Sequence, residues 1–91
     1  MALSVEREFD ILNRLGLHAR AAAQLVRMAN GFSSEVQVVK DGVEVNGKSI
    51  MGVLMLAAAK DTRILVRAIG LDAEEAVAAI GELIARKFGE E

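Results

Sequence analysis

The chain of 91 residues has no cysteine, no proline, no tryptophan and no tyrosine, and its only aromatic side chains are three phenylalanines. The missing cysteines exclude disulfide bonds, thiolate catalysis and thiolate metal sites. With so few aromatic rings, a surface that stacks nucleic-acid bases is not expected. The net charge of −2 argues against binding to a phosphate backbone, which favours a clustered basic surface. We therefore expect no nucleic-acid partner, no metal and no cofactor.

Long apolar runs are absent as well. No stretch reaches the roughly 18 residues that a membrane-spanning helix requires, and the first residues lack the basic and then apolar pattern of a signal peptide. Apolar residues make up 53% of the chain and charged residues 26%, a balance typical of globular proteins. The length suits one core without a separate catalytic lobe. The sequence thus predicts a single domain over residues 1–91, cytoplasmic and without membrane insertion.

The spacing of apolar residues predicts four strands and three helices in the order β-α-β-β-α-β-α. We expect strands at 5–12, 35–40, 43–46 and 62–69, and helices at 19–30, 50–59 and from about 73 to 88. Asp41-Gly42 marks a hairpin turn, and Asp72 with Glu75 resembles a capping box that opens the last helix. This order favours an α+β open-faced sandwich, a four-stranded antiparallel sheet with three helices on one face. The pattern does not give the order of the strands.

The predicted helix at 50–59 carries no charge and is apolar on every side. It is too short to span a bilayer, so it is either covered completely or open to a partner on one face. We interpret it as a docking patch, with Val53 and Leu56 directed inward and with Ile50, Met51 and Leu54 accessible. Methionine suits such a surface because its side chain is flexible and polarizable. Complete burial of the helix is the alternative.

His18 is the only histidine, and it lies where a segment loosened by Gly16 meets an alanine-rich helix. A helix start has free backbone N–H groups and the positive end of the helix dipole, so it attracts anions. A neutral imidazole can attack a phosphoryl donor while the helix amides and the Arg20 guanidinium hold the incoming charge. A lone histidine is more often a solvated side chain, and no second histidine is present to share a metal. The residues around His18, namely Gly16, Arg20 and the helix start, nevertheless favour its interpretation as a phosphoryl acceptor.

Two segments resemble the signatures of a known family. Gly16-Leu17-His18-Ala19-Arg20 and the segment 46–52, Asn-Gly-Lys-Ser-Ile-Met-Gly, are similar to the two motifs of the HPr family. Its members are histidine-containing phosphocarriers of the bacterial phosphoenolpyruvate-dependent sugar phosphotransferase system. The resemblance extends over about residues 5–88. It implies that Nδ1 of His18 receives a phosphoryl group from enzyme I and passes it to a sugar-specific enzyme IIA component, with the chain acting as a carrier monomer rather than as an independent enzyme.

The same resemblance assigns roles to other residues. Arg20 matches an arginine that assists transfer, and the amides around Ala19 and Arg20 match the phosphate-facing helix start. Ser49 matches a serine that an HPr kinase/phosphorylase modifies in some bacteria, although a plain N-cap would also explain a serine there. Further matches to partner-binding positions are Leu17, Arg27, Ile50, Met51 and Leu54.

One position departs from the family pattern. Ala21 stands where the family usually has a proline, inside the first helical turn. Proline there would cost no hydrogen bond and would preset the backbone, whereas alanine restores one N–H group. The phosphate geometry is therefore expected to be slightly looser.

Two other functions remain open at this point. A regulatory HPr paralogue, in nitrogen-related or carbon-catabolite control, would act through protein binding rather than sugar transport. A plain interaction module would use the apolar patch at 50–54 and would not need His18. An independent enzyme has the least support, because no substrate pocket or second catalytic group is indicated.

Overall fold

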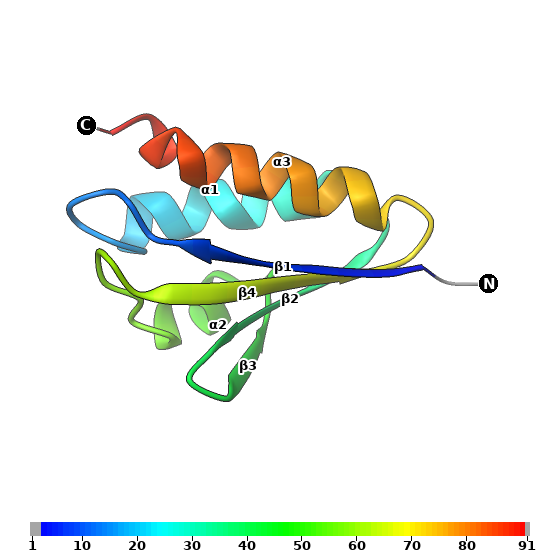
Figure 1. Cartoon of the computed structure of the whole chain (residues 1–91), viewed down its shortest axis with the longest axis horizontal. Helices are drawn as coiled ribbons and strands as arrows, with labels where there is room; N and C mark the ends of the chain where they lie inside the picture. The colour runs from blue at the N-terminus through cyan, green and yellow to red at the C-terminus, as the bar shows by residue number, and fades with distance from the viewer. Residues whose placement is uncertain (1–2, 91) are drawn as a thin grey trace.

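Alternating apolar and polar residues build one antiparallel sheet of four strands. The computed structural model describes residues 3–90, in which the strands are β1 (Ser4–Asp10), β2 (Glu35–Lys40), β3 (Val43–Asn46) and β4 (Arg63–Ile69). Their order across the sheet is β1-β4-β2-β3. β4 lies in the interior, where it pairs with β1 from Ser4↔Ile69 to Asp10↔Arg63 and with β2 on its other edge. Figure 1 shows β1 and β4 running side by side along the molecule.

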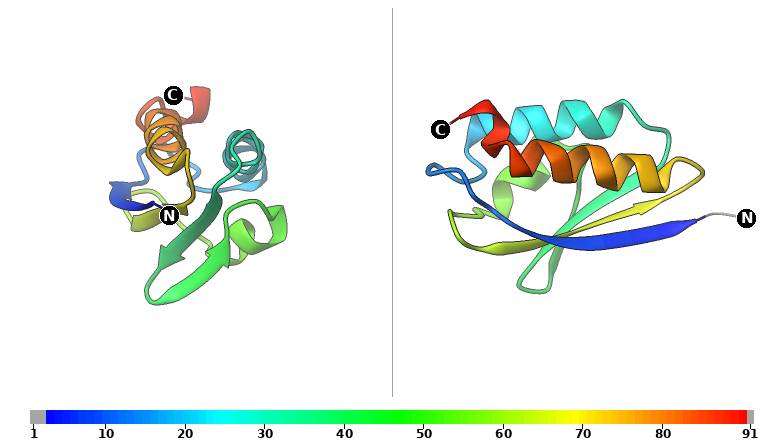
Figure 2. Two further views of the ribbon diagram at one scale, coloured as in Figure 1. Left: turned by 90° about the vertical axis from the view of Figure 1, so that its right-hand side faces the viewer. Right: turned by 45° about the horizontal axis from the view of Figure 1, so that its top comes forward.

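The helices are α1 (Ala19–Asn30), α2 (Ile50–Met55) and α3 (Ala73–Ala85), followed by a 3₁₀ turn, η1 (Lys87–Gly89). α1 and α3 lie next to each other over the sheet, and α2 lies beside β3 and contacts α1 (Figure 2). The predicted α+β open-faced sandwich is confirmed, including the β-α-β-β-α-β-α order.

The core lies between the sheet and the helices. In β4 every second side chain is buried, namely Ile64, Val66 and Ala68. The inward faces of α1 and α3 cover them with residues such as Leu25 and Ile80. Burial of this kind contributes about 25 cal/mol per Å² of apolar area, and it fixes α1, whose N-terminus carries the site, against the sheet.

Three predicted boundaries were wrong. α2 ends at Met55 rather than at residue 59, because Ala57 has a φ of +48°, outside the right-handed helical region. β1 ends at Asp10, and Leu12 lies in the following loop. Phe88 is buried as expected, but it belongs to η1 and not to the last helix.

The capping box predicted at the start of α3 was also wrong. The Asp72 side chain makes no cap on α3; its two carboxylate oxygens accept hydrogen bonds from the backbone N–H groups of Ser33 and Ser34, each at 2.9 Å. Both serine hydroxyls donate to it too. These bonds, led by that from the Ser34 hydroxyl, lower the pKa of Asp72 from 3.8 to about 2. The Asp72 carboxylate thus binds Ser33 and Ser34, which are distant in sequence, instead of the first backbone N–H groups of α3.

Candidate functional site

The loop from Ile11 to His18 is fixed against the loop that follows α2. Gly16 has a φ of +67°, and a Cβ atom on it would lie 2.4 Å from the carbonyl oxygen of Ala58. The next residue, Leu17, donates its N–H to that same oxygen at 2.8 Å. Only glycine allows this close approach with a left-handed backbone. The glycine of the first motif therefore sets the point at which the chain enters α1.

His18 is the N-cap residue of α1. Its backbone is extended (φ −73°, ψ 179°), and its carbonyl oxygen accepts the N–H of Ala22 at 2.8 Å. Its side chain makes no capping hydrogen bond. The N–H groups of Ala19, Arg20 and Ala21 consequently have no hydrogen-bond partner among residues 3–90. This helix start thus presents backbone N–H groups directly beside the imidazole, an arrangement that suits an anion.

The imidazole of His18 contacts Glu90, the last described residue. Its Nε2 lies 2.5 Å from Oε2 of Glu90, while Nδ1 makes no hydrogen bond within the described residues. The side-chain amide of Asn13 donates to Oε1 of Glu90 at 3.0 Å and to the carbonyl oxygen of Gly16 at 2.7 Å. The bond from Asn13, followed by that from His18, holds the pKa of the Glu90 carboxyl below its usual range. The sequence reading missed both residues.

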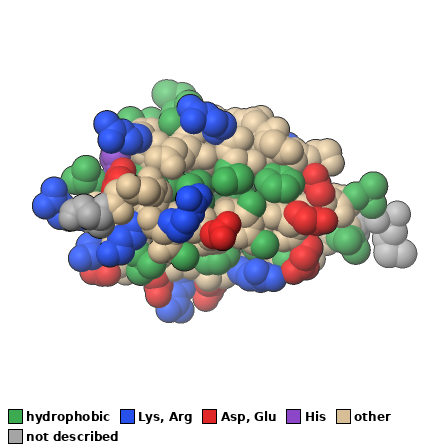
Figure 3. Space-filling model, turned by 90° about the horizontal axis from the view of Figure 1, so that it is seen from above, with side chains coloured by type: hydrophobic (Ala, Val, Ile, Leu, Met, Phe, Trp, Pro, Cys, Tyr) green, Lys and Arg blue, Asp and Glu red, His purple; other side chains and the backbone are tan. Residues whose placement is uncertain are grey.

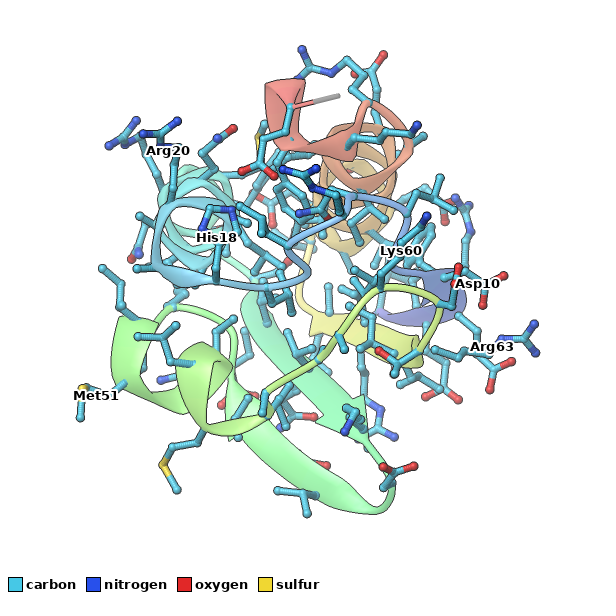
Figure 4. The ribbon with its side chains drawn as sticks, turned by 90° about the vertical axis from the view of Figure 1, so that its left-hand side faces the viewer. Asp10, His18, Arg20, Met51, Lys60 and Arg63 are labelled. Carbon is cyan, nitrogen blue, oxygen red and sulfur yellow. The ribbon has the colours of Figure 1, made fainter. Side chains whose placement is uncertain are left out.

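A cavity of about 460 Å³ opens beside the histidine, lined by Arg14, Leu15, His18, Ala19, Arg20 and Glu90. Figure 4 shows Arg20 extending from α1 into solvent above His18, and not in contact with the ring. Neither Arg14 nor Arg20 forms an ion pair within residues 3–90. In the view from above the helices, the single histidine lies at one end of the molecule next to basic side chains (Figure 3). The cavity thus combines free amides with two unengaged guanidinium groups.

The start of α2 matches its prediction closely. Ser49 is its N-cap, and its Oγ accepts the N–H of Gly52 at 3.1 Å. Val53 and Leu56 are buried as expected. The next part of the prediction needs an amendment, since Ile50 and Met51 are exposed, at 44% and 72%, but Leu54 is half-buried against the core.

Met55 was missed, although it is 74% exposed. It follows Met51 by four residues and so shares its face of the helix, a spacing that was legible in the sequence. We call the residues Ile50, Met51 and Met55 the α2 surface.

The two remaining partner positions differ in exposure. The side chain of Leu17 is only 4% exposed and packs in the core, so it offers a partner little area. Leu15, two residues earlier, is 60% exposed and lines the histidine cavity. Arg27 is exposed in the last turn of α1. The accessible leucine next to the site is therefore Leu15 rather than Leu17.

Comparisons with known proteins agree with this geometry. The family described as the PTS HPr component phosphorylation site matches residues 5–86. The chain belongs to the HPr family. The phosphocarrier protein HPr of Neisseria meningitidis serogroup A is 49% identical over 86 residues, covering 94% of this chain and 97% of the relative. That of Cupriavidus necator is 45% identical over 86 residues, with the same coverage of both chains. The crystal structure of HPr-C-His from Thermoanaerobacter tengcongensis has a TM-score of 0.93 at 46% identity, covering 96% of this chain and 98% of that one.

Family membership makes this chain a phosphocarrier of the bacterial phosphotransferase system, and confirms the resemblance drawn from its two motifs. Two solved relatives bear on finer points. An HPr dimer from Thermoanaerobacter tengcongensis has a TM-score of 0.77 at 46% identity, so a monomer does not follow from membership. Crh, the Bacillus subtilis catabolite repression protein, has a TM-score of 0.74 at 37% identity.

Within residues 3–90, every helix is too short or too polar to cross a membrane.

Proposed function

We propose that this chain accepts a phosphoryl group from phosphorylated enzyme I on Nδ1 of His18 and passes it to a sugar-specific enzyme IIA component in the cytoplasm. The observation that supports this most strongly is the uncapped start of α1. Three backbone N–H groups that have no partner among residues 3–90, together with the positive end of a twelve-residue helix, lie next to the only imidazole. An ordinary N-cap would have filled this place with its own side chain.

The chemistry is a displacement at phosphorus. The lone pair of Nδ1 forms the N–P bond while the bond from phosphorus to the donor breaks, and its electron pair leaves with the donor. The oxygens of the transferred group then carry negative charge at the helix start. The amides of Ala19 and Arg20 would donate to them, and the guanidinium of Arg20, which forms no ion pair within residues 3–90, would turn to them. The reverse displacement delivers the group to the acceptor.

Docking of both partners is assigned to the α2 surface together with Leu15 and Arg27. The support is the exposure of Ile50, Met51 and Met55 on a short helix that contacts α1. In the view of Figure 4, Arg20, His18 and Met51 lie along the same side of the molecule. Enzyme I and enzyme IIA would cover this side in turn, each placing its reacting group over the histidine.

Ser49 is assigned as a regulatory site for an HPr kinase/phosphorylase. Its hydroxyl is half-buried as the α2 cap, so a phosphate there would replace the bond to Gly52 N–H. It would also add about two negative charges directly beside the α2 surface. Phosphorylation of Ser49 is therefore expected to repel acidic partner surfaces and to slow transfer through His18.

A direct test uses enzyme I and labelled phosphoenolpyruvate. We expect the chain to take up label in an acid-labile and base-stable form, as a phosphohistidine does, and to release it to an enzyme IIA component. The matched control is His18→Ala, which should take up none. Label retained by His18→Ala would overturn the assignment of the acceptor.

A regulatory role without sugar transport is the second candidate, because a catabolite repression protein is among the solved relatives. Transport has more support, since the HPr relatives are more similar to this chain. One assay distinguishes the transport function from the regulatory one. A transport carrier gives up its phosphate to enzyme IIA, whereas a regulator keeps its phosphate in that mixture. Sugar permease genes beside this one would favour transport.

A further inference from the structure

The last described residues turn the chain back over the active histidine. Lys87, Phe88 and Gly89 all have positive φ values, 57°, 56° and 75°, so the backbone reverses direction after α3. Phe88 anchors the turn because its ring is buried in the core, and Gln24 of α1 donates to its carbonyl oxygen at 2.9 Å. Glu90 follows directly, and its N–H donates to Lys87 at 2.9 Å. Figure 2 shows the C-terminal segment next to the loop that precedes α1.

Asn13 ties this turn to the active-site loop. Its amide is fully buried and donates two hydrogen bonds, one to the carbonyl oxygen of Gly16 and one to the carboxylate of Glu90. Its own oxygen, Oδ1, is buried without a hydrogen-bond partner within residues 3–90. The opposite orientation of the amide would place that oxygen against two other acceptors. The amide is thus held in an otherwise unfavourable place, as groups that serve a site often are.

The contact with Glu90 decides which nitrogen of His18 is available. An ionised carboxylate only accepts hydrogen bonds, and its low pKa keeps Glu90 ionised. The ring nitrogen that faces it must therefore carry a proton, and that nitrogen is Nε2. In a neutral imidazole the other nitrogen then has the free lone pair. Glu90 leaves Nδ1 as the nucleophile.

We propose that Glu90 is a positioning residue that fixes the tautomer and orientation of the His18 ring through Nε2, an inference that rests on the phosphocarrier function proposed above. When Nδ1 forms its bond to phosphorus and the bond to the donor breaks, the ring keeps its proton on Nε2 and becomes cationic. The carboxylate of Glu90 faces that charge. When the phosphoryl group leaves, the ring returns to the neutral form with the proton still on Nε2. No proton has to move in either direction.

The first arm of the test observes the ring itself, without any donor. ¹⁵N-labelled histidine NMR at about pH 9, above the usual range of histidine, reports which nitrogen is protonated. In the unaltered protein we expect protonation at Nε2, with an Nε2–H signal that is shifted downfield and exchanges slowly. Glu90→Ala should lose the slow exchange and shift part of the population to Nδ1–H. Glu90→Gln keeps an acceptor and should restore the tautomer.

The second arm measures the initial rate of phosphorylation by enzyme I. We expect Glu90→Ala to lower this rate about tenfold, because it removes the charged hydrogen bond to the ring. Glu90→Gln should recover part of the loss, because it replaces that bond with a neutral one. The matched control is Glu82→Ala, which removes an exposed glutamate of α3 with no side-chain partner within residues 3–90. It should change neither measurement.

The outcomes separate the two proposals. If the unaltered protein takes up no phosphate while its ring is protonated on Nε2, the proposed function fails and the tautomer assignment stands. If Glu90→Ala keeps the tautomer and the unaltered rate, the positioning role is overturned. A change of tautomer with an unchanged rate also overturns it, because the contact would then be structural only.

Discussion

The starts of α1 and α2 differ in whether a side chain accepts their first backbone N–H groups. Both helices begin with backbone N–H groups that lack intrahelical partners. At α2 the side chain of Ser49 accepts one of them, from Gly52, whereas at α1 the side chain of His18 accepts none. The first arrangement stabilises a short helix from within, and the second leaves donors for a group that arrives from outside. The absence of a cap is therefore informative when a titratable nucleophile occupies the cap position.

The two ends also differ in what surrounds them. The start of α1 opens into a cavity lined by two arginines, Arg14 and Arg20, and by Glu90, whose carboxylate contacts Nε2 of the ring. The start of α2 leads into exposed apolar side chains, those of the α2 surface. We assign the chemistry to the first and the recognition of partners to the second. His18→Ala and the Ser49 variants change one of these two helix starts, and Asp72→Asn changes the start of α3.

The largest effect is expected from His18→Ala. Phosphate uptake should fall below detection, because His18 is the only histidine in the chain. Compared with Glu90→Ala, which already removes the hydrogen bond to His18, the free energy of unfolding should change by less than about 0.5 kcal/mol, because the His18 side chain makes no cap. Thermal denaturation followed by circular dichroism checks the second part. Destabilisation comparable to that of a lost cap would contradict the contrast between the two helix starts.

Ser49→Asp tests the second helix start through its charge. Aspartate is as good an N-cap as serine, so the fold should be kept. The new carboxylate lies beside the α2 surface and should lower the rate of phosphotransfer from enzyme I about tenfold by like-charge repulsion. Ser49→Asn is the control of equal size, since asparagine caps without charge. Equal rates for the two variants would argue against regulation at this serine.

Ser49→Ala removes the cap itself and should have a smaller effect. The N–H of Gly52 loses its acceptor, and the free energy of unfolding is expected to fall by about 1 kcal/mol. Urea denaturation at neutral pH measures this. The comparison with His18→Ala is direct: one substitution removes a capping side chain and the other does not. If His18→Ala lost as much stability beyond Glu90→Ala as Ser49→Ala loses, His18 would also cap its helix in solution.

The third helix start supplies the smallest effect. Asp72 has a pKa of about 2 in the folded protein, below the usual 3.8, because it accepts hydrogen bonds from Ser33 and Ser34. Its contribution to stability is therefore complete above about pH 4 and is lost as the pH falls toward 2. Asp72→Asn should flatten the pH dependence of unfolding in that window. An unchanged slope between pH 4 and 2 would show that other carboxylates dominate it.

Local signals in the sequence were sufficient to predict the strands and helices and the residues at two helix starts. The periodicity of apolar residues located all seven elements, and Ser49 and His18 were both found at the starts of helices. A cap is a contact over two or three residues, so it is legible from the chain alone. The failure at Asp72 shows the limit, because Ser33 and Ser34 compete for the same carboxylate from nearly forty residues away.

Contacts that the fold creates were not legible. Glu90 reaches His18 across 72 positions of sequence, and nothing in the local pattern of either residue indicates the other. Asn13 gave no signal either, since a buried amide in a loop looks like any other turn residue. The early end of α2 depends on Ala57, an alanine with a positive φ that no propensity would predict. The order of the strands follows from packing rather than from the pattern within each strand.

The contrast between the two helix starts is tested most directly by amide NMR before and after phosphorylation of the unaltered protein. If the phosphoryl group on His18 occupies the open end of α1, the N–H signals of Ala19 and Arg20 should move strongly downfield, as expected for new hydrogen bonds to an anion. The N–H of Gly52, already bonded to Ser49, should stay in place. Unchanged signals at Ala19 and Arg20 in a protein that carries phosphate on His18 would contradict the account.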